Sequence, residues 1–261
     1  MADVAKAVHL DRLSWKEAEA LLAQKPIALL PLGSTEAHGP HLPLGTDVII
    51  SEGMAVRAAE ALHAQGISTV ILPTLAYAVT EYASSFAGTL SISPEVVRAL
   101  LLDIARAVQR QGVEMLVLVN SHLEPGQIAI LRSLAKDGLA LTGLHIVFPD
   151  KTRKRWVGTL TEEFQRSACH AGSYETSLVL VDRPEWVRDN IRQELPELPI
   201  DLTAAMQAGV KRFEGAGATQ AYFGAPALAT LEEGHWTYER LTEMIVTTVL
   251  EARENIQPSA S

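Results

Sequence analysis

Cysteine is almost absent from this sequence, because Cys169 is the only one among 261 residues. A single cysteine can form neither an intrachain disulfide nor a cluster of thiolate metal ligands. The first ten residues also lack the basic segment and the long apolar core of a secretory signal. Both absences fit a reducing compartment, and we expect a cytoplasmic protein.

Long apolar runs and an excess of positive charge are absent as well. The apolar segments extend over only about six to ten residues, whereas a helix needs about 20 to cross a bilayer. The formal net charge is −9, and basic residues gather only at 151–155, which we interpret as a solvated loop. Because affinity for nucleic acid comes from Lys and Arg on phosphates, we expect neither a nucleic acid nor a membrane as a partner.

Short apolar runs alternate with amphipathic stretches along most of the chain. The runs at 26–32, 69–75, 115–120 and 145–148 are apolar on both faces, as in strands that helices cover on both sides. Helical patterns occupy 48–65, 93–112, 127–136 and 237–254, and Ser14 with Glu17 predicts a capping box for the first helix. This alternation predicts an α/β fold with a mostly parallel sheet. We expect one domain over residues 1–261, with a loop-rich segment at about 184–234.

Two of the expected strands end in similar tripeptides. Glu36 and His38 follow the first strand, and His122 and Glu124 follow the third. In extended chain, residues two apart point to the same side, so each pair presents two ligand side chains together. If the two strands lie in one parallel sheet, both pairs meet at its carboxyl edge, where open α/β sheets bind ligands. A strand-end Glu or His taken alone is more often a surface or capping residue; the combination favours a metal site.

The number of ligands indicates two ions. Together with Asp47, which opens a helix, the pairs give five imidazole and carboxylate ligands of the kind that Zn²⁺ and Mn²⁺ accept. Five are too many for one catalytic ion that keeps a position open, and they suit two ions with Asp47 as the bridge. A hydroxide bridging the ions would neutralise the site and serve as the nucleophile. His41 orients a ligand or is only a loop residue; the sequence leaves both open.

At these residues the sequence resembles the creatininase family. The family pattern Glu-x-His-Gly-x-His-Leu-Pro, followed by Gly-Thr-Asp, matches the segment from Glu36 to Asp47. Further matches are Asn120-Ser121-His122, His170-Ala171-Gly172 with Glu175-Thr176-Ser177, and a weaker one at Gly88-Thr89-Leu90-Ser91. The resemblance implies a three-layer α/β/α sandwich, two divalent ions and a homo-oligomer, typically a hexamer. It also implies hydrolysis of a non-peptide C–N bond in a small substrate, often a cyclic amide.

The resemblance also assigns roles to single residues. Glu36, Asp47 and His122 would hold one ion, Mn²⁺ or Zn²⁺, and His38, Asp47 and Glu124 would hold a Zn²⁺. We expect Glu175, His170 and Glu124 to take part in catalysis, with Glu175 or His170 passing a proton to the leaving nitrogen. We expect Thr80, Leu123 and Glu175 to contact the substrate.

The substrate itself stays open at this point. Leu123 and Pro125 depart from the family pattern, as does the segment 80–86, so the chemistry is better defined than the molecule on which it acts. A formamide, a lactone-like ring or a short peptide are alternatives on the same dinuclear site, since a fold alone does not choose among them. A metal-stabilised binding protein without catalytic activity is the alternative outside the enzymes.

Overall fold

The computed structural model describes residues 7–166 and 169–256. At its centre is a sheet of four parallel strands in the order β2-β1-β3-β4. β1 and β3 pair along their whole lengths, from Ile27 opposite Met115 to Leu32 opposite Asn120. The four predicted strands are confirmed, although the second ends earlier than predicted: the bounds are β1 (Ile27–Leu32), β2 (Thr69–Ile71), β3 (Met115–Asn120) and β4 (His145–Val147).

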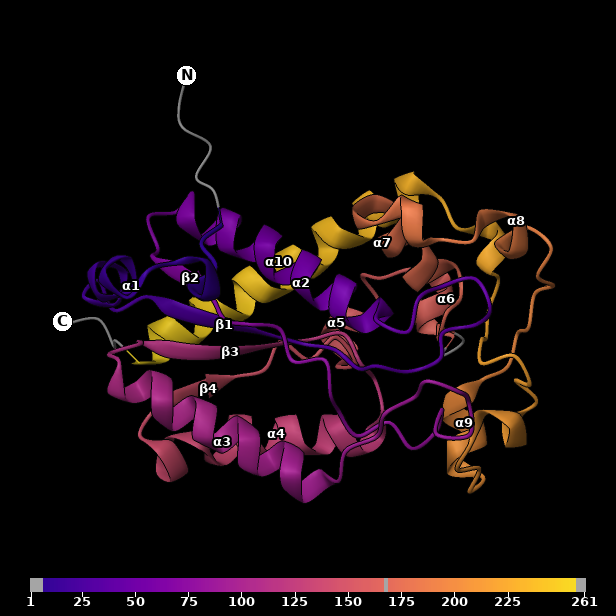
Figure 1. The fold of residues 1–261 in the computed structure, drawn as a ribbon, viewed down its shortest axis with the longest axis horizontal. Coiled ribbons are helices and arrows are strands. Elements are labelled where there is room, and N and C mark those ends of the chain that lie inside the picture. The colour runs from indigo at the N-terminus through magenta and orange to yellow at the C-terminus, as the bar shows by residue number, and fades with distance from the viewer. Residues whose placement is uncertain (1–6, 167–168, 257–261) are drawn as a thin grey trace.

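Helices cover both faces of this sheet (Figure 1). On one face lie α2 (Thr46–His63), α7 (Ser173–Asp182) and α10 (Leu231–Ile256), and on the other lie α3 (Pro94–Arg110) and α4 (Pro125–Thr142). Successive residues of a strand point to opposite faces, so Ile27 and Leu29 join the core under α2 while Ala28 and Leu30 join the core over α3 and α4. The predicted α/β/α sandwich with a parallel sheet is confirmed.

Two helices are longer than their sequence patterns indicated. α4 was expected over 127–136, just before Gly138, but it extends from Pro125 to Thr142, and the left-handed residue that ends it is Gly143 (φ 75°). Gly138 lies inside the helix because α4 packs closely on β4: a methyl group added there would be 2.7 Å from Cδ1 of Ile146. The last helix starts at Leu231, six residues before the expected start at Thr237.

The remaining elements are short. The expected capping box of Ser14 and Glu17 is present at the start of α1. Between α7 and α10 the chain forms short helices joined by loops, and Phe213 and Phe223 of this stretch pack against Ala37 and Ala83 in a small third core. The bounds are η1 (Leu10–Arg12), α1 (Trp15–Leu22), α5 (Lys154–Val157), α6 (Glu162–Gln165), η2 (Pro184–Trp186), α8 (Asp189–Arg192), α9 (Leu202–Gln207), η3 (Phe213–Ala216) and η4 (Pro226–Leu228).

The strand order creates a crevice at the carboxyl edge of the sheet. From β1 the chain continues through α2 on one face, and from β3 it continues through α4 on the other face. Neighbouring strands whose connections leave toward opposite faces form the topological switch point at which such sheets bind ligands. The loops after β1 and β3, which carry the predicted ligands, therefore meet at this crevice.

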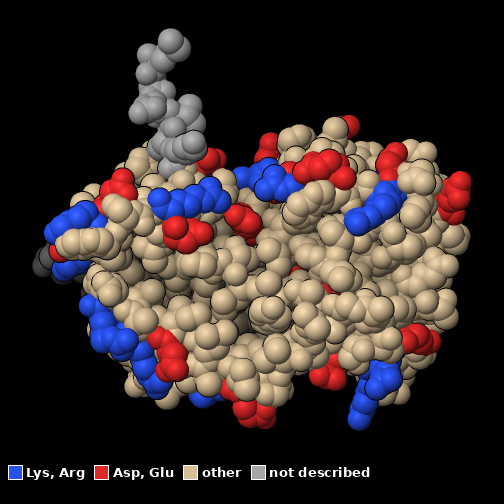
Figure 2. All heavy atoms as spheres, viewed as in Figure 1, with Lys and Arg blue, Asp and Glu red and all other residues tan. Residues whose placement is uncertain are grey.

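Among the described residues, no helix is both long enough and apolar enough to cross a bilayer. On the face seen in Figure 1, charged side chains lie mainly around the margin and the middle is mostly uncharged (Figure 2).

Candidate metal centre

The predicted ligands come together at the carboxyl edge of the sheet. Glu36 and His38 lie in the loop after β1, Asp47 lies in the first turn of α2, and His122 follows β3. A further carboxylate, Glu175, reaches them from the first turn of α7. All five side chains are buried, with at most 4% of each residue exposed. Four of the five predicted ligands thus meet, and Glu175 joins them.

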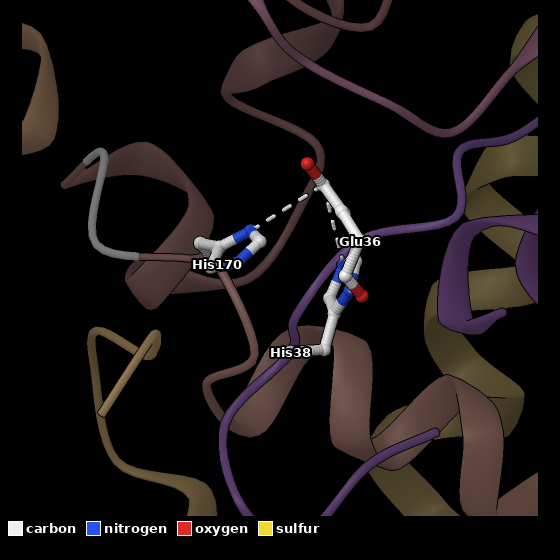
Figure 3. Close-up of side chains that lie close together, drawn as sticks. All are labelled: Glu36, His38 and His170. Carbon is white, nitrogen blue, oxygen red and sulfur yellow. Dashed lines mark hydrogen bonds and ion pairs between the residues drawn. The ribbon is translucent and has the colours of Figure 1, made fainter. Parts of the chain in front are cut away.

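Three sets of ligand atoms lie close enough to hold an ion. In each set the atoms are all within 4.8 Å of one another: Glu36 with Asp47 and His122, His38 with Asp47 and Glu175, and Glu36 with His38 and His170. Figure 3 draws the last set, with the side chains of His38 and His170 directed toward Glu36. Glu36, His38 and Asp47 each belong to two of the sets, and the carboxylates of Glu36 and Asp47 have two oxygens with which to bridge ions.

Hydrogen bonding fixes how His122 presents its ring. Nε2 is 2.7 Å from the carbonyl oxygen of Val79, and because a carbonyl only accepts, Nε2 carries the proton. Nδ1 then offers its lone pair, and it lies 3.1 Å from Oε1 of Glu36 and 3.1 Å from Oδ2 of Asp47. When the ring is neutral, three acceptor atoms therefore face one another, and a proton on Nδ1 or a cation between them is needed to make the contact favourable.

His38 is fixed in the opposite orientation. Its Nδ1 donates to the carbonyl oxygen of Glu36 at 3.1 Å, which leaves the lone pair on Nε2. Nε2 is buried and has no hydrogen-bond partner among the described residues. It lies 3.5 Å from Oε2 of Glu175 and 3.9 Å from Oδ2 of Asp47. A buried acceptor pointing at carboxylates is costly unless a cation lies between them.

The ionisation of the cluster reflects the same requirement. Burial opposes charge on His122, but the carboxylates of Glu36 and Asp47 raise its pKa well above the ordinary value. Burial likewise disfavours the charged form of Asp47, yet the hydrogen bond and charge of His122 and the charge of His38 keep its pKa below the ordinary value. The cluster binds positive charge, which a proton or a metal ion supplies.

Hydroxyl groups hold the carboxylates in place. Ser121 Oγ donates to Oδ1 of Asp47 at 2.7 Å. Thr80 Oγ1 donates to Oε2 of Glu36. Thr80, which we expected to contact the substrate, is fully buried, and its hydroxyl donates to Glu36 instead. The Gly88–Ser91 segment supports this loop, because Ser91 Oγ accepts from the amide of Thr80 at 3.1 Å.

Glu124 was predicted to be a metal ligand, but the structure places its carboxylate away from the other ligand atoms. Its carboxylate oxygens accept from the backbone amides of Glu81 at 3.0 Å and Tyr82 at 3.2 Å. It belongs to none of the three sets of ligand atoms, and Glu175 lies beside His38 in its stead. Glu175 is held there by a 2.7 Å bond from the amide of Ala171. Burial raises the pKa of Glu175 to about 7 against the opposing charge of His38, with Asp47 adding to the rise.

His170 presents a free ring nitrogen beside the cluster. Its Nε2 donates to the carbonyl oxygen of Ala37 at 2.9 Å, and its Nδ1 lies 4.0 Å from Oε1 of Glu36. Burial, together with the charge of His38, lowers the pKa of His170 to about 4, so the ring is neutral at neutral pH.

His41 packs outside the ligand sets. Its Nε2 lies 3.0 Å from the hydroxyl oxygen of Thr176, the residue after Glu175. Burial lowers the pKa of His41 to about 3, and nearby His38 and Arg192 act in the same direction. Of the two alternatives that the sequence left open, His41 is a loop residue, but a buried one whose contact is to Thr176 and not to a candidate ligand.

The basic segment 151–155 was expected to be solvated, and for Lys151 this is wrong. Lys151 is 3% exposed, and its Nζ donates to the hydroxyl of Tyr174 at 3.3 Å. Burial lowers the pKa of Lys151, although Glu175 and Asp47 oppose the change. The signal that could have identified it is its place just after β4, at the same sheet edge as the ligands.

A cavity of about 350 Å³ opens onto the cluster, a volume in the range of small-molecule sites. Leu123, which we expected to contact the substrate, lines it, and so do Glu124, His170 and Glu175. Thr80 is not among the lining residues. The arrangement combines buried metal-ligand atoms with an adjoining pocket, as hydrolytic metal sites require.

Comparison with known proteins gives consistent matches. The sequence profile of the creatininase family, described as creatinine amidohydrolase, matches residues 11–249. A mycofactocin precursor peptide peptidase from Mycobacterium ulcerans is 30% identical over 246 residues, which cover 92% of this chain and 91% of that protein. A creatinine amidohydrolase from Pseudomonas putida is 32% identical over 127 residues, 46% of this chain and 47% of that protein. A solved structure described as "Creatininase Mn" superposes with a TM-score of 0.71 at 25% identity, covering 95% of this chain and 99% of that one.

Proposed function

The chain belongs to the creatininase family, and from this premise we propose that it hydrolyses an amide C–N bond of a small substrate with two divalent metal ions. The observation that carries the proposal is the convergence of buried lone pairs. Nδ1 of His122 and Nε2 of His38 face the carboxylates of Glu36, Asp47 and Glu175 from two directions. Three carboxylates held this close repel one another unless cations lie between them.

The geometry supports one assignment of the ligands. Glu36, Asp47 and His122 would hold the first ion, and His38, Asp47 and Glu175 would hold the second. Oδ2 of Asp47 faces both imidazoles, at 3.1 Å from Nδ1 of His122 and 3.9 Å from Nε2 of His38, and is the candidate bridging atom. Imidazole and carboxylate ligands suit Zn²⁺ or Mn²⁺. The assignment replaces Glu124 of the sequence-based set by Glu175.

Metal ions bound here would polarise a carbonyl group and lower the pKa of a water molecule. The chain's own residues divide the remaining work. Thr80 and Ser121 orient the carboxylates of Glu36 and Asp47 through their hydroxyl groups. Nδ1 of His170 can accept a proton from a substrate or water at the cavity wall. Glu124 lines the same cavity without belonging to a ligand set, so its carboxylate could take up the proton released by the attacking water and pass it to the leaving nitrogen.

Metal analysis of the purified protein tests the dinuclear site. After loading with Zn²⁺ or Mn²⁺ and removal of free metal, we expect about two ions per chain, as the two ligand sets sharing Asp47 imply. Asp47→Asn should lose both, whereas Asp103→Asn, the same change on an exposed helix surface, should keep both. A stoichiometry of one ion or fewer in the loaded wild-type protein contradicts the proposal.

The substrate is either a cyclic amide or a short peptide. The similarity to a creatinine amidohydrolase, which extends over 46% of this chain, supports the first. The similarity to mycofactocin precursor peptide peptidases over 92% of the chain supports the second. Metal-loaded protein should be assayed in parallel with creatinine, other cyclic amides and short peptides. Turnover of none of them by protein that carries two ions contradicts the hydrolase assignment and favours a binding protein.

We also propose that the chain forms a homo-oligomer in the cytoplasm, as its single cysteine and its surface suggest. Several large apolar side chains are exposed: Trp186 by 47%, Leu228 by 69%, Leu231 by 54% and Trp236 by 42%. The middle of the face in Figure 2 is also mostly uncharged. Light scattering that gives the mass of one 28.2 kDa chain at micromolar concentration contradicts the oligomer.

A further inference from the structure

The cavity beside the metal centre has two chemically different walls. One wall is the ligand cluster with Glu124 and His170. The rest of the lining is mostly apolar and comes from segments far apart in the sequence; this apolar wall includes Leu123, Val157, Phe164, Leu202, Met206 and Phe213. Apolar surface that lines a cavity gains free energy only when a ligand covers it, so this wall indicates an apolar group on the substrate.

The part of the wall formed by the segment 184–234 is separate from the metal ligands. Leu202 and Met206 lie four residues apart on α9, so they share one face of that helix, and both are only half-buried. Phe213 is 4% exposed and packs with its ring 4.4 Å from the ring of His170. The apolar wall therefore extends from α9 to Phe213, which contacts His170 beside the ligand cluster.

Charge in the cavity disfavours an anionic substrate. Among the described residues that line it, none is Lys or Arg, while Glu36, Asp47, Glu124 and Glu175 are carboxylates. Two divalent ions would carry four positive charges and these carboxylates four negative ones, so no net positive charge is left to attract an anion. Lys151 does not line the cavity: its ammonium is buried against Tyr174, where its charge acts on Glu175 and Asp47 and offers no contact to a ligand.

We propose that the cavity selects a neutral substrate that carries an apolar group next to the scissile C–N bond, with Leu202, Met206 and Phe213 as specificity-determining residues. The inference rests on the proposed metal-dependent function. It distinguishes this site from one built for a small polar heterocycle, which would leave the α9 side of the cavity without contacts. It applies equally to a cyclic amide with an apolar substituent and to a peptide with an apolar side chain.

Hydroxamates provide a probe that does not require the natural substrate. Their two oxygens bind a divalent ion, and the attached chain then extends into the adjoining cavity. Binding to the zinc-loaded protein is measured by calorimetry for acetohydroxamate, for hexanohydroxamate and for the carboxylate-bearing monohydroxamate of succinic acid. Each methylene group that is buried against an apolar wall increases the affinity about fourfold. We expect hexanohydroxamate to bind at least about tenfold more tightly than acetohydroxamate, and the succinic compound to bind no more tightly than acetohydroxamate.

Two variants of α9 locate the effect. Met206→Lys places an ammonium in the wall and should abolish the gain with chain length while improving binding of the succinic compound. Ala204→Lys adds the same charge at an exposed position of α9 outside the cavity lining and should behave as the wild-type protein does.

The outcomes distinguish a failure of the apolar specificity from a failure of the metal site. The apolar specificity is contradicted if all three hydroxamates bind equally, or if Met206→Lys keeps the gain in affinity with chain length. Either result leaves the proposed metal site unaffected. Failure of even acetohydroxamate to bind, together with a metal content below two, overturns the proposed function and this inference with it.

Discussion

Gly33 is where the end of β1 lies closest to the first turn of α2, directly beside Asp47. A methyl group added at Gly33 would lie 2.5 Å from the amide nitrogen of Val48 and 2.7 Å from the carbonyl carbon of Asp47. Both are backbone atoms, so no side-chain rotation relieves the contact. Ordinary contact begins at 3.4 Å, so Gly33→Ala must move the first turn of α2 by about 0.9 Å.

Two effects follow from this displacement, one on stability and one on metal affinity. Overpacking of this kind costs about 1–3 kcal/mol of unfolding free energy. In a chain of this size, that lowers Tm by roughly 2–12 °C. Metal binding should weaken as well, because ligand distances tolerate only about 0.2 Å and Asp47 belongs to both proposed ligand sets. We expect the affinity for both ions to fall by at least about 10- to 100-fold, the loss known for displaced supporting groups.

Competition with a chromogenic chelator measures the metal affinity, and thermal unfolding of the metal-free protein measures the stability. Gly45→Ala is the matched control, since Gly45 precedes α2, has φ −91°, and would meet no atom within 4 Å of an added methyl group. It should keep both ions. If Gly33→Ala binds two ions as tightly as Gly45→Ala does, α2 is not held in place by this contact and the reasoning is refuted.

Three further predictions concern single side chains. Thr80→Val should weaken metal binding about 10- to 100-fold in a chelator competition by removing the donor to Glu36, and Thr80→Ser should restore it. Glu175→Gln should leave about one ion by elemental analysis, because it removes a carboxylate from the His38 set; two retained ions would return Glu175 to a role in proton transfer alone. Burial lowers the pKa of His41 to about 3 in the folded protein, so on acidification the unfolded chain takes up this proton first. The free energy of unfolding, measured in urea, should therefore fall as the pH drops below 6.5. His41→Gln should remove about 1.4 kcal/mol per pH unit of that loss, and equal slopes in both proteins would contradict it.

The layers of the fold could be predicted because strands buried on both faces leave a simple pattern. The run from Met115 to Val119 is apolar throughout, and it lies between two helical layers as such runs do. Helix ends were less predictable, since Gly138 is typical of a helix end and the structure places it inside α4. Its lack of a side chain serves the contact with Ile146, a partner that no local pattern reveals.

Four of the five predicted ligands meet because their positions follow from geometry that the sequence carries. Glu36 with His38 depends on two-residue spacing, His122 on the end of a neighbouring strand, and Asp47 on a helix start. The role of Thr80 was not accessible in this way. A hydroxyl in a loop looks the same whether it faces a substrate or the carboxylate of a residue 44 positions earlier.

The choice between Glu124 and Glu175 illustrates what decides the rest. Both carboxylates lie at the start of a helix near the same sheet edge, and burial raises the pKa of each. A carboxylate this deeply buried turns toward whichever donors satisfy its oxygens. Glu124 finds two backbone amides, of Glu81 and Tyr82, which a loop more than 40 residues earlier brings to it. Glu175 finds only the amide of Ala171, which leaves it 3.5 Å from His38 and available to a cation. Since the deciding donors belong to the folded loops, Glu175 could be recognised as the better candidate ligand only after the fold had placed those loops beside the strand ends.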